Sequence, residues 1–171
     1  MRIYATFCLL GVIPLLASCS AQPITLAPVR SSPFTGGSAS VGAGHLQVFS
    51  SLAEQSDDQN QGSTDPAPAW YQHTDYNVYD KGGKLVKHVD NAVGHYSTSP
   101  RLVSLRPGNY IVRARAAEGL SVNVPVVIEH GRTTKVHLDE NWKPPAGTQK
   151  TEIVSAPGNY PVGWRTDLLA K

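Results

Sequence analysis

Between Gly44 and Asp139, apolar side chains alternate with polar ones in short runs that glycine and proline interrupt. From Tyr110 to Ala116, and again from Val122 to Ile128, every second residue is apolar or aromatic. Successive side chains of a strand point to opposite faces, so this period of two predicts half-buried strands. Only the stretch from 45 to 55 is ambiguous, because Leu46, Phe49 and Leu52 also recur at helical spacing.

Turn residues separate these runs. Lys81-Gly82-Gly83-Lys84 supplies the positive φ of a tight hairpin, and Pro107-Gly108 suits the centre of a type II turn. Seven short strands in about 95 residues with such turns predict an all-β fold, an antiparallel seven-stranded β-sandwich over residues 45–139. Pro125 cannot donate to a strand ladder, so we expect its strand at a sheet edge or a bulge. Residues 51–69 are expected to form a long polar loop.

Three segments carry a family resemblance. Residues 76–86, 103–114 and 127–138 resemble hairpins of carboxypeptidase-regulatory-like and transthyretin-like sandwiches, and the last also resembles PEGA and Cna-B domains. The resemblance covers roughly residues 44–139 and implies an immunoglobulin-like or transthyretin-like sandwich. Such modules act as scaffolds, stalks, ligand-binding accessories or enzyme appendages, so the resemblance implies a fold more than a function.

The N-terminal segment has the pattern of a leader. Arg2 is followed by an apolar stretch from Phe7 to Ala17, which Pro14 interrupts, and Leu16-Ala17-Ser18-Cys19 closes it. That ending resembles the lipobox of bacterial lipoproteins. The resemblance implies a signal peptide over residues 1–18, cleavage before Cys19 and lipid (palmitate-type acylation) on its sulfur. Ser20 implies an outer-membrane address in a cell with two membranes. An ordinary secretory signal is the alternative.

Cysteine and charge counts limit the chemistry of the mature chain. Cys8 leaves with the leader and Cys19 would carry lipid, so neither disulfide, thiol nucleophile nor thiolate metal site is expected. The mature chain has 14 basic and 13 acidic residues, a formal net charge of +1. This balance does not predict nucleic acid as a partner.

Two segments flank the predicted sandwich. Residues 19–44 are rich in Ser, Pro, Gly and Ala, which predicts a lipidated, disordered tether. As a flexible coil, residues 20–44 would span about 28 Å, and fully extended roughly 85 Å. At the other end, residues 140–171 predict a linker followed by a short hairpin near Thr151 to Ser155 and Pro157-Gly158.

No motif supports catalysis or a metal site. There is no Gly-x-Ser-x-Gly elbow, and the histidines lack metal-ligand spacing. We therefore predict neither an enzyme nor a cofactor.

Aromatic residues give the best indication of binding. Trp70, Tyr76 and Tyr110 share parity with apolar positions and are expected in the core. The remaining candidates could stack on sugar rings at the surface: Tyr71, Tyr79, Trp142 and Trp164.

Three functional hypotheses follow. The first is a non-enzymatic, lipid-anchored envelope protein whose β-sandwich is structural or binds another envelope protein. The second is a carbohydrate-binding accessory for peptidoglycan or polysaccharide. The third and weakest is a periplasmic metal-binding protein.

Overall fold

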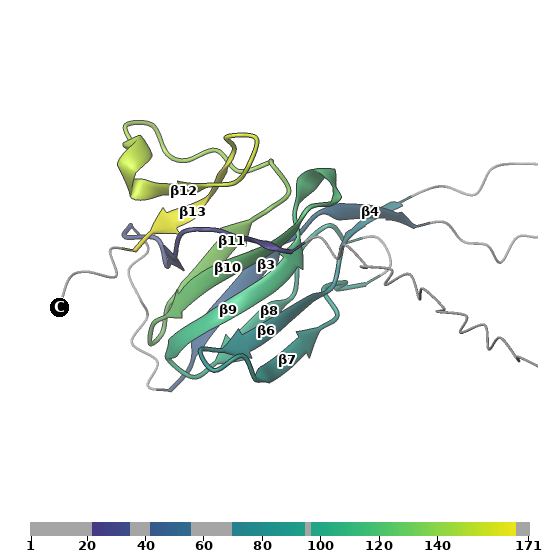
Figure 1. The fold of residues 1–171 in the computed structure, drawn as a ribbon, viewed down its shortest axis with the longest axis horizontal. Helices are drawn as coiled ribbons and strands as arrows, with labels where there is room; N and C mark the ends of the chain where they lie inside the picture. Colours follow the sequence, from purple (N-terminus) through teal and green to yellow (C-terminus); the bar gives the residue numbers. More distant parts are fainter. Residues whose placement is uncertain (1–21, 35–41, 56–69, 95–96, 167–171) are drawn as a thin grey trace, which may run out of the picture.

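The computed structural model describes residues 22–34, 42–55, 70–94 and 97–166. Within these ranges the chain is all-β, with two short 3₁₀ turns, η1 (Ala117–Gly119) and η2 (Lys150–Glu152), and no α-helix (Figure 1). The strands are β1 (Ile24–Thr25), β2 (Val29–Arg30), β3 (Gly44–Phe49), β4 (Leu52–Gln55), β5 (Trp70–His73), β6 (Tyr76–Asp80), β7 (Leu85–Val89), β8 (Leu102–Leu105), β9 (Gly108–Arg115), β10 (Ser121–Ile128), β11 (Thr133–His137), β12 (Ile153–Ser155) and β13 (Pro161–Arg165).

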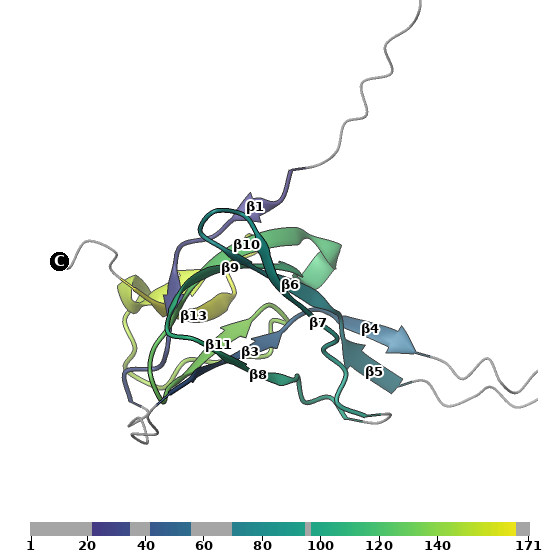
Figure 2. The ribbon, with the colours of Figure 1, turned by 90° about the horizontal axis from the view of Figure 1, so that it is seen from below.

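These strands form three sheets. The eight-stranded sheet has the order β12-β13-β2-β10-β9-β6-β7, with β1 also paired to β10. The three-stranded sheet has the order β11-β3-β8, and β4 pairs with β5 as a separate hairpin. Figure 2 shows the strands β10, β9 and β6 on one side of the molecule and β11, β3 and β8 on the other. The two larger sheets therefore face each other across a common core.

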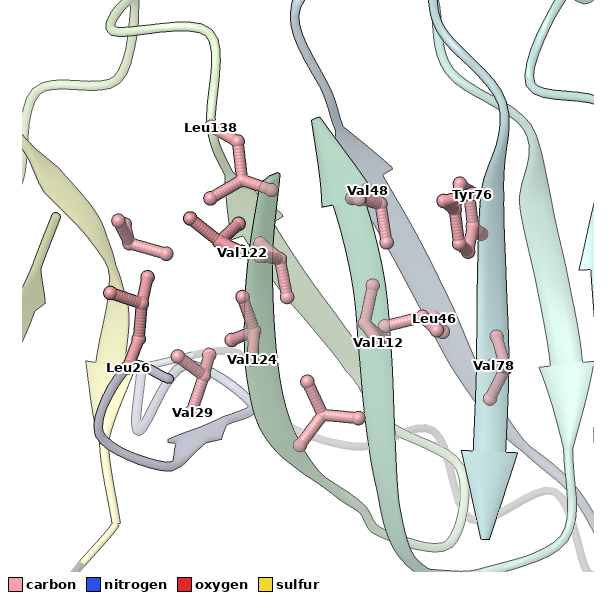
Figure 3. Close-up of a cluster of buried hydrophobic side chains, with 14 of the residues drawn as sticks. Leu26, Val29, Leu46, Val48, Tyr76, Val78, Val112, Val122, Val124 and Leu138 are labelled. Atoms are coloured by element: carbon pink, nitrogen blue, oxygen red, sulfur yellow. The ribbon is translucent and has the colours of Figure 1, made fainter. Parts of the chain in front are cut away.

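The core consists mainly of valine and leucine from the alternating strands. Leu46 and Val48 of β3 point from the three-stranded sheet toward Val78 and Val112 of the eight-stranded sheet (Figure 3). All four side chains are completely buried. The period of two in the sequence correctly predicted these positions, and also buried Tyr76, because burial alternates along the same strands. Tyr110 is only partly buried against the core and Trp70 is half-buried.

The prediction of a purely antiparallel, seven-stranded arrangement is wrong. The sheets are mixed, because β11 runs parallel to β3 from Thr133↔His45 to His137↔Phe49. β1 and β2 also run parallel to β10. Alternation within one strand predicts which side chains are buried, but it contains no information about the direction of the neighbouring strand.

The predicted tether is also wrong for residues 22–34. Val29 of β2 is completely buried and Leu26 is nearly so. β2 lies between β10 and β13, and the backbone N–H of Leu26 donates to the carbonyl oxygen of Asn123 at 2.9 Å. This segment is therefore part of the domain. Its composition resembles a linker because only two of its side chains need to be apolar.

The C-terminal hairpin was predicted correctly, and it belongs to the same sheet. β12 pairs with β13, and β13 pairs with β2 through Trp164↔Arg30. A Cβ on Gly163 would lie 2.6 Å from Val29 Cγ1 and 3.0 Å from the Lys135 carbonyl oxygen. The absence of a side chain at Gly163 thus lets β13 pack closely against β2 and β11.

Proline and glycine act differently from expectation at two positions. Pro125 lies inside the sheet, where β10 pairs with β9 on one side. On the other side the ladder is interrupted between Asn123, opposite β1, and Val126, opposite β2, so no donor is missing from a continuous ladder. Gly108 begins β9 with a φ of 155° and is not the centre of a type II turn.

A type II turn is found instead at Pro157-Gly158. Gly158 has a φ of 94°, and the N–H of Asn159 donates to the carbonyl oxygen of Ala156 at 3.1 Å.

The first residues of the segment 51–69, which was expected to be a polar loop, form a β-strand. Leu52–Gln55 form β4, which pairs with β5. The stretch 45–55, which also had helical spacing, therefore forms strands β3 and β4 and no helix. Residues 56–69 lie outside the described part of the chain.

Candidate functional site

The predicted aromatic residues do not form one platform. Tyr71 lies on the β4–β5 hairpin and is 51% exposed. Tyr79 lies on β6, with the Arg113 guanidinium 5.1 Å from its ring centre. Only Trp142 and Trp164 come together, with ring centres 6.0 Å apart. Cys19 lies outside the described residues.

Trp164 was wrongly predicted at the surface. It is only 7% exposed, because β13 pairs with β2 and the rings of Phe34 and Trp142 contact it. The sequence did not show that β13 would join the main sheet, so it gave no reason to bury this side chain.

Six aromatic rings form a continuous line, which we call the aromatic row. Trp142 stacks on His137 at 5.0 Å and 10°, and His137 stacks on Phe49 at 4.3 Å and 17°. The last two residues are register partners on β11 and β3. At the two ends of the row, edge-to-face contacts join Phe34 to Trp164 at 5.4 Å and Phe49 to His73 at 5.7 Å. In order, its members are Phe34, Trp164, Trp142, His137, Phe49 and His73.

His137 is the buried ionisable group of this row. Burial lowers the pKa of His137 to about 4, which outweighs the opposing effect of the Asp139 carboxylate. Lys135 and His73 add to the lowering. The ring is therefore neutral at neutral pH and suited to stacking between Phe49 and Trp142. The aromatic row is thus mainly a structural seam between the C-terminal segment and the three-stranded sheet.

This environment predicts a pH dependence of stability. The pKa of His137 falls from 6.5 to about 4 on folding, so the unfolded chain takes up its proton first as pH decreases. The stabilisation is complete above about pH 6.5, and roughly 3 kcal/mol is lost between there and pH 4. Urea unfolding across this range should show a smaller slope for His137→Gln, while exposed His130→Gln keeps it. An equal slope in wild type and His137→Gln would contradict the assignment.

A second feature is the side of the molecule where both larger sheets end. β7 is the last strand of the eight-stranded sheet and β8 the last of the three-stranded sheet, and they lie near each other in both views (Figures 1 and 2). Four large apolar side chains on these strands and their connection are about half exposed. We call this surface the open edge: Leu85 (50%), Val86 (46%), Val93 (48%) and Leu102 (55%).

Sequence reasoning missed the open edge. Leu85, Lys87 and Val89 share parity, and alternation alone would place them on one half-buried face, yet only Val89 is buried. Among the described strands β7 pairs with β6 alone, so within this part of the chain its side chains are covered from one side only. The lysines at 84 and 87 were the available signal, because lysine is common on edge strands.

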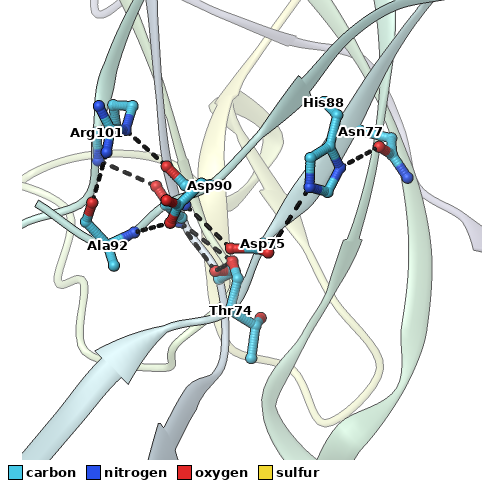
Figure 4. Close-up of polar contacts among 9 residues, drawn as sticks. Thr74, Asp75, Asn77, His88, Asp90, Ala92 and Arg101 are labelled. Carbon is cyan, nitrogen blue, oxygen red and sulfur yellow. Dashed lines mark hydrogen bonds and ion pairs between the residues drawn. The ribbon is translucent and has the colours of Figure 1, made fainter.

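A buried asparagine, Asn91, fixes the connection between β7 and β8. Figure 4 shows the polar contacts of this region, with Asp75, Asp90 and Arg101 labelled. The Asn91 side-chain nitrogen donates to the carbonyl oxygen of Val48 at 2.9 Å and to Ser50 Oγ at 3.1 Å. Its side-chain oxygen accepts the backbone N–H of Arg101 at 3.0 Å, and its own N–H donates to Asp75 Oδ1 at 3.1 Å. Asn91 therefore joins the two sheets at the open edge.

Three further histidines of the described ranges have polar partners. His73 Nδ1 donates to the Ser50 carbonyl oxygen at 2.6 Å, and His88 Nδ1 lies 2.8 Å from Asn77 Oδ1. His45 Nδ1 lies 3.2 Å from Ser104 Oγ. Among the residues in the described ranges, no three His, Cys, Asp or Glu side chains are grouped to hold a metal ion.

The chain was compared with known protein families, curated proteins and solved structures. Within the described ranges, no helix is long and apolar enough to cross a membrane. No family model, no curated protein and no solved structure matches the chain.

Proposed function

We propose that this chain is a lipid-anchored cell-envelope protein whose β-sandwich, of the immunoglobulin-like or transthyretin-like kind, binds another envelope protein without catalysing a reaction. The open edge is the observation that carries the proposal. Exposed apolar side chains occur singly on most protein surfaces, whereas a group of them indicates an interaction site. Here four such side chains lie on the last strand of each of the two larger sheets and on the segment that connects those strands.

The backbone of β7 adds to this surface. No second strand of the described ranges pairs with β7, so the N–H and C=O groups along its side away from β6 are available to an extended partner segment. In β-strand addition, main-chain hydrogen bonds supply affinity and side chains on alternate positions supply specificity. Leu85 and Val86 lie where the register between β6 and β7 shifts by one residue, and both are about half exposed, so an added strand would contact them.

The envelope location is supported by the sequence around Cys19, which resembles a lipobox. The chemistry of a lipidated N-terminus would keep the protein at a membrane surface, since each buried CH₂ contributes about 0.8 kcal/mol. A partner in the same compartment is then met at high local concentration, so an open edge of modest area is sufficient for binding.

The test is site-specific photocrosslinking in the native envelope. A photoreactive residue replacing Leu85 should give a discrete protein adduct. The same residue replacing Tyr71, which has equal exposure on a different hairpin, should not. Combining the probe at Leu102 with Val86→Glu should abolish the adduct, because a charge would be placed in the contact. Equal labelling from Leu85 and Tyr71, or none from either, would contradict the proposal.

Carbohydrate binding is a second candidate, favoured by one observation. Phe34 is 73% exposed and, like the half-buried Trp142, contacts Trp164, so two accessible rings flank a buried one. Trp164 itself is not a suitable probe because its removal would leave a cavity. Retention on insoluble glycan that is lost in Trp142→Ala and Phe34→Ala, but kept in Tyr71→Ala, would support this candidate over protein binding.

A further inference from the structure

We propose that the outer face of the eight-stranded sheet beside β1, with Arg113 and Arg115, lies against a lipid surface that contains anionic headgroups. The inference rests on the proposed anchor at Cys19. It adds an orientation that the anchor alone does not provide: one face of the domain meets the membrane, and the three-stranded sheet faces away from it.

The first argument is the length of chain between the anchor and the fold. Ile24, the first residue of β1, is five residues after Cys19. At roughly 3.3–3.6 Å per residue, this chain spans at most about 18 Å. The far longer tether expected from composition does not exist, because β1 and β2 are both paired to β10. The domain therefore stays close to the lipid into which Cys19 is inserted.

The second argument is the side from which the chain leaves. Figure 2 shows β1 on the side of the eight-stranded sheet that is farthest from β11, β3 and β8. Stacked sheets lie about 10 Å apart, so the outer face of the three-stranded sheet is removed from the anchor by at least that thickness. A tether of at most about 18 Å therefore favours contact between the membrane and the outer face of the eight-stranded sheet.

The third argument is the charge of that face. β9 and β10 contain two arginines and no acidic residue, and both arginines are exposed on the outer face. Arg113 lies over Tyr79 and donates from Nε to Asn123 Oδ1 at 3.1 Å, which holds the guanidinium in place. Carboxylates lie at the border of this face: Asp75 is 3.7 Å from His88, and Arg115 lines surface hollows with Asp90, Glu118 and Asp139. Arginine pairs well with phosphate, and tyrosine is common at membrane interfaces.

The experiment places spin labels on the two outer faces of the lipidated full-length protein. Ser121→Cys puts a label on β10 beside β1, and Lys135→Cys puts one on β11 of the three-stranded sheet. Both positions are exposed, and acylation of Cys19 leaves the new thiol as the only reactive one. The protein is incorporated into phosphatidylcholine–phosphatidylglycerol vesicles that carry nickel-chelating headgroups. Broadening of the label by nickel reports its proximity to the membrane surface.

We expect several-fold greater broadening at Ser121→Cys than at Lys135→Cys. A long Gly/Ser insertion between Gln22 and Pro23 should remove the difference, and Arg113→Gln with Arg115→Gln should reduce it. Equal broadening at both positions in protein whose mass includes the lipid would overturn the orientation and leave the anchor intact. Protein without lipid would overturn the anchor and the orientation together.

Discussion

Replacing Leu26 and Val29 together by alanine is expected to lower the free energy of unfolding by about 3–6 kcal/mol. Both side chains are buried in the common core, and Val29 has no exposed surface. Alanine would remove apolar contacts and leave a cavity between β10 and β13. Since small domains are stable by only about 5–15 kcal/mol, this loss is a large part of the total.

The matched control lies in the same segment. Ile24 is 42% exposed and Thr25 is exposed, so alanine at both should change stability by less than about 0.5 kcal/mol. Urea unfolding followed by tryptophan fluorescence measures both variants. If Leu26→Ala with Val29→Ala were as mild as the control, residues 22–34 would be a tether, and the short distance between Cys19 and the domain would no longer hold.

Asn91→Ala is expected to cost about 2–4 kcal/mol. The substitution removes the side-chain bonds to Val48, Ser50 and Arg101 and leaves the buried carbonyl oxygen of Val48 without this donor. An unsatisfied buried polar group costs about 1–3 kcal/mol, and several are affected here. The connection between β7 and β8 should also exchange its amide hydrogens faster, because Asn91 holds it against β3.

Asn77→Ala is the comparison for this variant. Asn77 Oδ1 lies 2.8 Å from exposed His88 Nδ1, and solvent can replace that bond. Its stability should stay within about 0.5 kcal/mol of wild type. Similar effects of the two substitutions would mean that Asn91 does not join the sheets. If Asn91→Ala also weakened crosslinking from Leu85, the geometry of the open edge would depend on this residue.

The sequence predicted the parts of the fold that depend on single strands. Alternation placed Val112, Val124 and Tyr76 in the core because a strand with one buried face must alternate. The hairpin at Lys81 to Lys84 also follows from local chemistry: Gly83 has a φ of 81°, and Asp80 Oδ1 accepts the backbone N–H groups of Gly82 and Lys84.

The features of the fold that the sequence did not predict depend on which strands lie next to each other. β2 contains two residues, too few to show a period, and its burial of Val29 arises only from pairing with β10 and β13. Trp164 was expected at the surface because nothing local indicates that β13 joins the eight-stranded sheet. Conversely, alternation alone would half-bury Leu85, and it is exposed because β7, as the last strand of the described sheet, pairs with β6 alone.

The candidate site shows the same division. Trp142 was singled out as an aromatic residue, but its stacking on His137 requires that the chain return to β11 after the strand ends. Predicting the open edge requires the order of the strands in each sheet, and the composition of the chain contains no information about that order. Sequence reasoning thus identified residues with binding potential, while the sheet arrangement decides which of them are accessible.

The anchor is the central claim, since both the envelope location and the orientation depend on it. The most direct test is the intact mass of protein extracted from its native membrane, compared with a Cys19→Ala variant. We predict a chain that begins at Cys19 and carries added lipid mass, which is absent from the variant. An unmodified chain cleaved at another position, with the same mass behaviour in Cys19→Ala, would contradict the account.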